Sequence, residues 1–173
     1  MIHMPTQKTS LQADKEDKNG THQSLPADVL LIYPYFYTHA PKAMLFHPLG
    51  IAQLAAILRG LGLRTHVIDC TFENRQDVIS KIVHACPRIV GIYAMLSMSE
   101  NALALAGTIR KVLPETLLVC GGPLPTLKPG HFSTLFDAVF CGEADISFPR
   151  FCVDYIESNS FPAGLPLFVE SPE

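Results

Sequence analysis

Five short apolar runs recur along the chain at intervals of about 25 residues, and a segment with helical character follows each of them. The runs are Val29–Tyr33, Arg64–Asp69, Arg88–Tyr93, Thr116–Cys120 and Asp137–Cys141. The first shows no polar alternation, which is typical of a strand covered on both faces. We therefore predict an α/β fold of the flavodoxin-like (Rossmann-type) class, a doubly wound sheet of five parallel strands in the order 2-1-3-4-5, over about residues 27–158.

The segments between the runs predict the helices and their ends. Pro48 suits the first position of a helix over residues 49–61, which is so apolar that it should be covered on more than one side. Further helices are expected over residues 73–85, from the serines after the third run to Pro114, and from Gly142 to about residue 157. A proline-containing loop is expected between the fourth and fifth strands.

The two ends of the chain differ from the middle. Residues 1–26 are mostly polar and predict a disordered tail or linker, because they cannot bury enough apolar surface to offset their ordering entropy. Residues 159–173 contain three prolines and one glycine, which predicts a linker toward a missing or following domain.

Composition excludes several classes of function. The net charge is −3, and the Lys and Arg residues are scattered, so we expect no nucleic-acid binding. The longest apolar run, around residues 49–58, is interrupted by Gln53 and is too short for a membrane span, and the polar N-terminus argues for a cytoplasmic protein. The five cysteines contain no Cys-x-x-Cys pair and are expected to be buried, reduced and not metal ligands.

The fourth apolar run ends at Gly121 and Gly122, two adjacent residues without a Cβ atom. In an open parallel sheet, ligands bind at the carboxyl ends of the strands, so this pair indicates either room for a ligand or only a tight turn. A Gly-x-Gly-x-x-Gly turn is missing after the first strand, and so is a phosphate-binding Gly-x-x-x-x-Gly-Lys loop. The loop after strand one is aromatic, which disfavours flavin mononucleotide, and the acidic strand ends of a receiver domain are missing. A large, flat, mostly apolar ligand remains.

A series of motifs in fixed order carries a family resemblance. It comprises Pro48-Leu-Gly-Ile-x-x-Leu-Ala-x-x-Leu58-Arg-x-x-Gly62, Val67-Ile-Asp69, Ile89-Val-Gly-Ile92, Val119-x-Gly-Gly-Pro123-x-Pro-Thr126 and Asp137-x-Val-x-x-Gly142-Glu143. This series resembles the N-terminal, cobalamin-binding domain of the cobalamin-dependent radical S-adenosylmethionine enzymes. The resemblance covers roughly residues 27–158.

The resemblance implies a domain that holds cobalamin for methyl transfer or related radical chemistry by a radical S-adenosylmethionine catalytic domain absent from this chain. It implies that Gly121 and Gly122 leave room for the nucleotide tail. The side chains that would pack on the corrin are Tyr35, Phe36, Leu49, Met95 and Leu96. The side chains that would hydrogen-bond its polar edges are Ser97, Ser99 and Thr126. The motif residues Pro123, Gly142 and Glu143 complete the expected cofactor site, although Ser97 and Ser99 would also suit a helix cap.

Two departures from the family pattern matter. Leu124 stands where members often carry a histidine, and no Cys-x-x-x-Cys-x-x-Cys loop for an iron–sulfur cluster exists. Any cluster or S-adenosylmethionine would therefore belong to a domain not present here, in cis or in trans. We expect a fragment of a longer enzyme; a stand-alone cobalamin or corrinoid carrier and a cofactor-free flavodoxin-like interaction domain are the alternatives.

The loop after the first strand bears on the lower ligand of cobalt. Cobalamin domains of the methionine synthase kind use an Asp-x-His-x-x-Gly motif, whereas here Tyr37 stands two residues before His39 and Lys42 three residues after it. A histidine without its carboxylate partner is poorly held. We predict base-off cobalamin with no histidine as the lower ligand, and with both His39 and His47 as surface residues.

Overall fold

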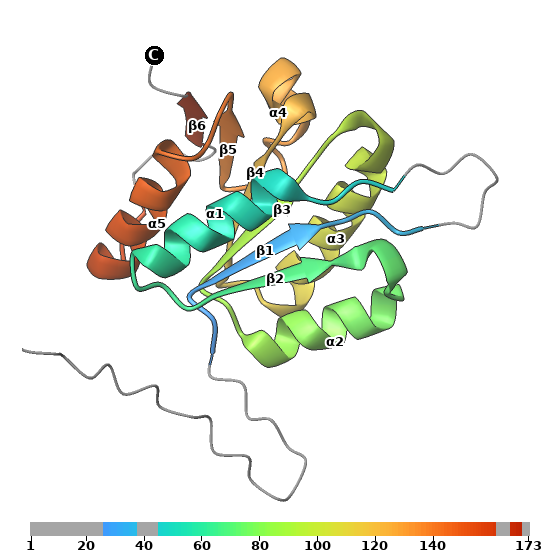
Figure 1. The fold of residues 1–173 in the computed structure, drawn as a ribbon, viewed down its shortest axis with the longest axis horizontal. Helices are drawn as coiled ribbons and strands as arrows, with labels where there is room; N and C mark the ends of the chain where they lie inside the picture. Colours follow the sequence, from blue (N-terminus) through green and yellow to red (C-terminus); the bar gives the residue numbers. More distant parts are fainter. Residues whose placement is uncertain (1–25, 38–44, 162–166, 171–173) are drawn as a thin grey trace, which may run out of the picture.

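The structure, a computed structural model, describes residues 26–37, 45–161 and 167–170. Its centre is a six-stranded sheet in the order β2-β1-β3-β4-β5-β6, with every neighbouring pair parallel (Figure 1). In that order the strands are Thr65–Asp69, Val29–Tyr33, Ile89–Tyr93, Leu117–Gly121, Ala138–Cys141 and Leu167–Glu170. The predicted fold class and the order of the first five strands are confirmed.

Helices connect successive strands. The α-helices are α1 (Leu49–Gly60), α2 (Arg75–Ala85), α3 (Ser99–Val112), α4 (Pro123–Leu127) and α5 (Ser147–Ser158). Three short 3₁₀ turns, η1 (Cys70–Phe72), η2 (Leu96–Met98) and η3 (Pro129–His131), follow β2, β3 and α4. The segment that we predicted as a loop after the fourth strand thus contains α4 and η3. Pro123 opens α4 at a position where a helix needs no backbone donor.

The sixth strand lies inside the segment that we predicted as a linker. Leu167 and Val169 are half-buried against the hydrophobic core that includes residues of α1 and α5, whereas Phe168 and Glu170 are exposed. This is the period-two pattern of an edge strand. The strand is short, and Leu167 pairs with Ala138 of β5. The nearby prolines concealed it in the sequence, because proline normally argues against a strand.

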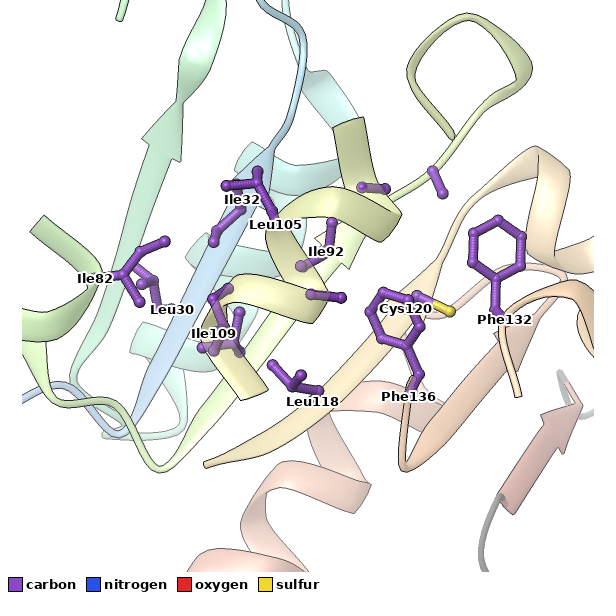
Figure 2. Close-up of a cluster of buried hydrophobic side chains, with 14 of the residues drawn as sticks. Leu30, Ile32, Ile82, Ile92, Leu105, Ile109, Leu118, Cys120, Phe132 and Phe136 are labelled. Atoms are coloured by element: carbon purple, nitrogen blue, oxygen red, sulfur yellow. The ribbon is translucent and has the colours of Figure 1, made fainter. Parts of the chain in front are cut away.

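The two faces of the sheet are covered by different helices. One face packs against α2 and α3 through Leu30, Ile92 and Leu118, and Figure 2 shows these side chains meeting Leu105 and Ile109 of α3. The other face packs against α1 and α5. Alternation along each strand sends neighbouring residues to opposite faces, so the two cores are built from alternate positions of the same strands.

Helix α1 is covered on one side only, which corrects our expectation. Ile51, Ala55 and Leu58 are buried, but Leu49 is 76% exposed and Ala52 is exposed as well. The outer side of the helix consists largely of small residues, which have little apolar area and therefore gain little from burial.

The prediction that the cysteines are buried holds for three of the five. Cys70, Cys120 and Cys152 are buried, and burial raises the pKa of the Cys70 thiol to about 12. Cys141 is half-buried. Cys86 is exposed, because it ends α2 in a left-handed conformation with φ 40° at the surface.

Ion pairs lie at the amino ends of the strands. The Asp28 carboxylate accepts hydrogen bonds from the Arg64 guanidinium, one of them at 2.7 Å, and these bonds hold the pKa of Asp28 below its ordinary value. The Asp137 carboxylate accepts from the guanidinium of Arg110 at 2.9 Å and from the Leu118 amide at 2.8 Å. Both pairs lie away from the carboxyl ends of the strands.

Candidate functional site

A cavity of about 320 Å³ lies between the sheet and the helices α1 and α5, toward the carboxyl ends of the strands. The sheet contributes Leu31, Gly91–Tyr93, Val119–Gly122 and Phe140 to its wall. Helix α1 contributes Gly50, Ile51, Gln53 and Leu54, and the segment after β5 contributes Gly142–Asp145 and Phe148. The cavity therefore joins residues from both halves of the chain.

Two glycines on adjacent strands of the sheet line this cavity. Gly91 lies in register between Leu31 of β1 and Val119 of β4. A Cβ atom on Gly91 would come within 2.9 Å of Leu31 Cδ2 and 3.4 Å of Phe148 Cζ, so any side chain there would displace the wall. Gly121 pairs with Tyr93, two positions nearer the carboxyl end, and a Cβ there would meet only Phe140, at 3.6 Å. Gly91 thus lets Leu31 and Phe148 pack closely against the sheet, whereas Gly121 leaves its part of the cavity wall without a side chain.

Gly122 has a different reason to be glycine. Its φ is +117°, and a Cβ atom would lie 2.7 Å from the Ala94 carbonyl oxygen. The backbone of this turn also bonds to the end of β3, with the Ala94 amide donating to the Gly121 carbonyl at 2.8 Å. Gly122 therefore permits the close approach of two backbone segments, whereas Gly121 lines the cavity in an ordinary conformation.

The polar side chains of the cavity lie near its opening. The Gln53 amide of α1 donates to the Asp145 carboxylate at 2.9 Å, which links α1 to the segment after β5. Glu143 lies in the same segment and is exposed. Because the residues along the strands below are mostly aliphatic, aromatic or glycine, polarity falls with depth.

Thr126 ties together the two turns that flank the cavity. Its hydroxyl donates to the Gly122 carbonyl at 2.9 Å and accepts from the Gly142 amide, also at 2.9 Å. Gly142 has a φ of +83°, which favours glycine, so the turn before Glu143 has a defined conformation. Thr126 thereby fixes the position of the segment that carries Glu143 and Asp145.

Three tyrosines cluster at the ends of β1 and β3, and one of them, Tyr93, lines the cavity. The ring of Tyr33 lies 5.6 Å from that of Tyr93 and 6.3 Å from that of Tyr35. Burial raises the pKa of both Tyr33 and Tyr93, so these phenols stay neutral at physiological pH.

Large apolar side chains are exposed around the same end of the sheet. Each belongs to a segment that follows the carboxyl end of a strand: Leu45, Phe46 and Leu49 after β1, Phe72 after β2, Leu96 after β3, Leu127 after β4 and Ile146 after β5. We call these seven residues the apolar rim. Such a concentration of exposed apolar groups is typical of a binding surface.

Ten of the thirteen predicted cofactor residues fall into three groups in the structure. Gly121, Gly122, Gly142 and Glu143 line the cavity. Leu49 and Leu96 belong to the apolar rim, and Ser97 and Pro123 are exposed at the same end of the sheet. Tyr35 and Met95 are half-buried against the α1 and α5 core.

Phe36, Ser99 and Thr126 have protein partners in the structure. Phe36 packs against the α2 and α3 core, with the guanidinium carbon of Arg75 4.6 Å from its ring centre. The Ser99 hydroxyl donates to the Leu96 carbonyl at 3.2 Å and does not cap α3. Thr126 bridges two backbone groups, as described above.

Sequence reasoning missed Gly91, Gln53 and Asp145. A glycine inside a buried strand indicates a close approach or a missing side chain, so Gly91 carried a usable signal. No local signal exists for Gln53 and Asp145, since they lie 92 residues apart and meet only in the folded chain.

Among residues 26–37, 45–161 and 167–170, no three His, Cys, Asp or Glu side chains gather as ligands for a metal ion. In the same part of the chain, no helix has the length and apolar character needed to cross a membrane.

Comparison with known proteins gives a family model and similar solved structures. The family model described as "B12 binding domain" matches residues 42–151. Two structures of the cobalamin-dependent S-adenosylmethionine radical enzyme OxsB are similar to this chain with a TM-score of 0.62, one with aqua-cobalamin bound and one with aqua-cobalamin and S-adenosylmethionine bound. Their sequence identities are 15% and 16%, and the alignments cover 82% of this chain and 20% of those chains. No curated protein matches.

Proposed function

The chain belongs to the B12-binding domain family, and from this membership we propose that it holds cobalamin over the carboxyl ends of β1, β3, β4 and β5 and presents it to a radical S-adenosylmethionine catalytic domain. The chain spans about a fifth of the length of the OxsB structures that it matches, so the catalytic part of the proposal concerns residues outside this chain.

The observation that carries the proposal is the cavity lined by Gly121, which lies at the same end of the sheet as the apolar rim. A whole corrinoid is far larger than 320 Å³, so the macrocycle would rest on the rim and only the nucleotide tail would enter. Gly121 provides the fit, because a side chain at this position would occupy the cavity wall where the tail passes.

The rim residues fit the apolar body of the macrocycle. Leu49 and Leu96 are 76% and 79% exposed, so contact with a corrin would remove large apolar areas from water. Ser97 and the loop carrying Glu143 lie at the same end and would hydrogen-bond its amide side chains. Thr126 acts indirectly in this proposal, by holding Gly142 in place.

Cobalamin supplies, when bound, the cobalt-centred chemistry needed for methyl transfer or a related radical reaction. The residues of this chain bind the cofactor, orient it and exclude water from its lower side.

We further propose that cobalamin binds base-off, with no histidine below cobalt. His47 is exposed in the segment before α1, and His39 lies outside the described residues. Entry of the base into the cavity would remove it from cobalt. Electron paramagnetic resonance of the cobalt(II) form should then show no nitrogen superhyperfine splitting, and a splitting that disappears in His39→Ala would contradict this proposal.

Retention of cobalamin by the 173-residue chain tests the proposed function. The protein is incubated with hydroxocobalamin, passed over a desalting column and examined by absorption spectroscopy. We expect about one corrinoid per chain, with a spectrum changed from that of the free cofactor. A protein fraction without corrinoid absorbance would refute cofactor binding.

The catalytic partner is tested separately. The chain contains no Cys-x-x-x-Cys-x-x-Cys sequence, so we expect no turnover of S-adenosylmethionine by these 173 residues even when they are loaded with cobalamin. Turnover that requires only the loaded chain would contradict the assignment of the chemistry to a second domain.

A further inference from the structure

We propose that the cavity selects among corrinoids by their lower base, and that it favours a benzimidazole base over a purine base. This inference rests on the proposed function and concerns the part of the ligand that enters the cavity. It follows from the distribution of hydrogen-bonding groups along the wall.

The lower part of the cavity is apolar. Leu31 and Val119 flank Gly91 on the sheet, and Phe140 and Phe148 meet edge to face, with ring centres 5.2 Å apart. None of these side chains has a polar atom. The backbone amides and carbonyls here belong to the parallel ladders of β1, β3 and β4, so they are already paired.

The polar side chains of the cavity are confined to the part near its opening. Gln53 and Asp145 are bonded to each other at 2.9 Å, and Glu143 is exposed in the same segment. Tyr93 lies in the same row as Gly121, two positions closer to the carboxyl end than Gly91. A base that reaches the level of Gly91 therefore lies deeper in the cavity than these polar groups and forms no hydrogen bonds with them.

This distribution penalises a purine. A base such as adenine carries an exocyclic amine and two more ring nitrogens than benzimidazole, and each of them loses a hydrogen bond to water on entry. Burying such groups without partners is costly, whereas the methyl groups of dimethylbenzimidazole gain from an apolar wall. Discrimination of about tenfold or more, which corresponds to 1.4 kcal/mol, is expected from one or two unpaired groups.

The test compares dissociation constants for the full 173-residue chain and three corrinoids. They are cobalamin, the cobamide with adenine as its lower base, and cobinamide, which lacks the nucleotide. We expect cobalamin to bind at least about tenfold more tightly than the adenine cobamide. Equal affinities, or tighter binding of the adenine cobamide, would overturn the inference while leaving the proposed function intact.

Failure of the proposed function would look different. If none of the three corrinoids binds, both the function and this inference fail. If cobinamide binds as tightly as cobalamin, the corrin is held but the cavity does not receive the base, and the inference alone is overturned.

Paired variants locate the selectivity in the cavity. Leu54→Gln adds an amide to the cavity wall, whereas Ile57→Gln adds the same amide on α1 at a half-buried position outside the wall. We expect Leu54→Gln to reduce the preference for cobalamin about threefold or more and Ile57→Gln to preserve it. Equal effects of the two variants would show that the cavity does not discriminate between lower bases.

Discussion

The two faces of the sheet are built from the same strands but differ in how completely they are filled. On the α2 and α3 face, the central strands present Leu30, Ile32 and Leu118, and these side chains are fully buried against the helices (Figure 2). On the α1 and α5 face, the central strands present Gly91 and Gly121. One residue of displacement along a strand thus separates a packed core from a ligand-sized space.

The two faces therefore contribute differently to the stability of the fold and to ligand binding. The α2 and α3 face contributes buried apolar area and hence stability. The α1 and α5 face gives up part of that area, which is expected where a protein binds a ligand. The predictions below test this division, beginning with the largest expected effect.

Truncation of a leucine should cost much more on the filled face. Leu118 is fully buried, so Leu118→Ala should lower the free energy of unfolding by about 3 kcal/mol, through lost transfer energy and a new cavity. Leu54 is half-buried beside an existing cavity, and Leu54→Ala should cost about 1 kcal/mol. Urea unfolding of the two variants measures the difference, and equal losses would argue against unequal packing.

The two adjacent glycines should respond differently to a methyl group. Gly122→Ala should lower the free energy of unfolding by roughly 1–3 kcal/mol, because φ is +117° and the new Cβ would lie 2.7 Å from the Ala94 oxygen. Gly121→Ala is the matched control and should change it by less than about 1 kcal/mol. Similar losses in thermal or urea unfolding would show that the glycines do not have separate roles.

Thr126 should act through its hydroxyl. Thr126→Val removes the bonds to Gly122 and Gly142 and should lower the free energy of unfolding by about 1 kcal/mol, together with a weaker affinity for cobalamin. Thr126→Ser keeps the hydroxyl and should behave more like the parent. If the valine variant matches the parent in both measurements, the hydroxyl bridge has no role in holding the cavity segment.

The smallest effect is expected at the amino ends of the strands. The pKa of Asp28 is lowered from 3.8 by its bonds to Arg64, so the carboxylate stabilises the fold above its unfolded-state pKa. That contribution, below about 1 kcal/mol, is lost as the pH falls through the lower folded-state pKa. Asp28→Asn should flatten this part of the profile of unfolding free energy against pH. A profile identical to that of the parent would exclude the linkage, and cobalamin affinity should stay unchanged.

The features of the fold that can be predicted from the sequence are those that local sequence patterns indicate. Continuous apolar runs located the first five strands, and Pro48 marked the start of α1. The edge strand at Leu167–Glu170 was missed because a strand of four residues with prolines on both sides carries too little pattern.

The site was predicted in part for the same reason. Gly121 and Gly122 are visible as a pair in the sequence, but only the φ angle and the contact with Ala94 separate their roles. Thr126 was expected to face the cofactor, whereas its hydroxyl bridges two backbone groups, one of which lies 16 residues away along the chain. The pairing of Gln53 with Asp145 depends on the packing of α1 beside the segment after β5, which no local pattern encodes.

The most direct test of the account is cobalamin affinity in a graded series at Gly121. Alanine, valine and leucine at this position place increasing volume in the cavity wall, in a backbone conformation that tolerates a side chain. Gly107→Leu is the control, because a Cβ on Gly107 of α3 meets nothing within 4 Å. With circular dichroism confirming the fold, we predict affinity that falls with side-chain size, by about tenfold or more at leucine, and parental affinity for Gly107→Leu. Parental affinity in a folded Gly121→Leu protein would contradict the claim that this cavity receives the cofactor.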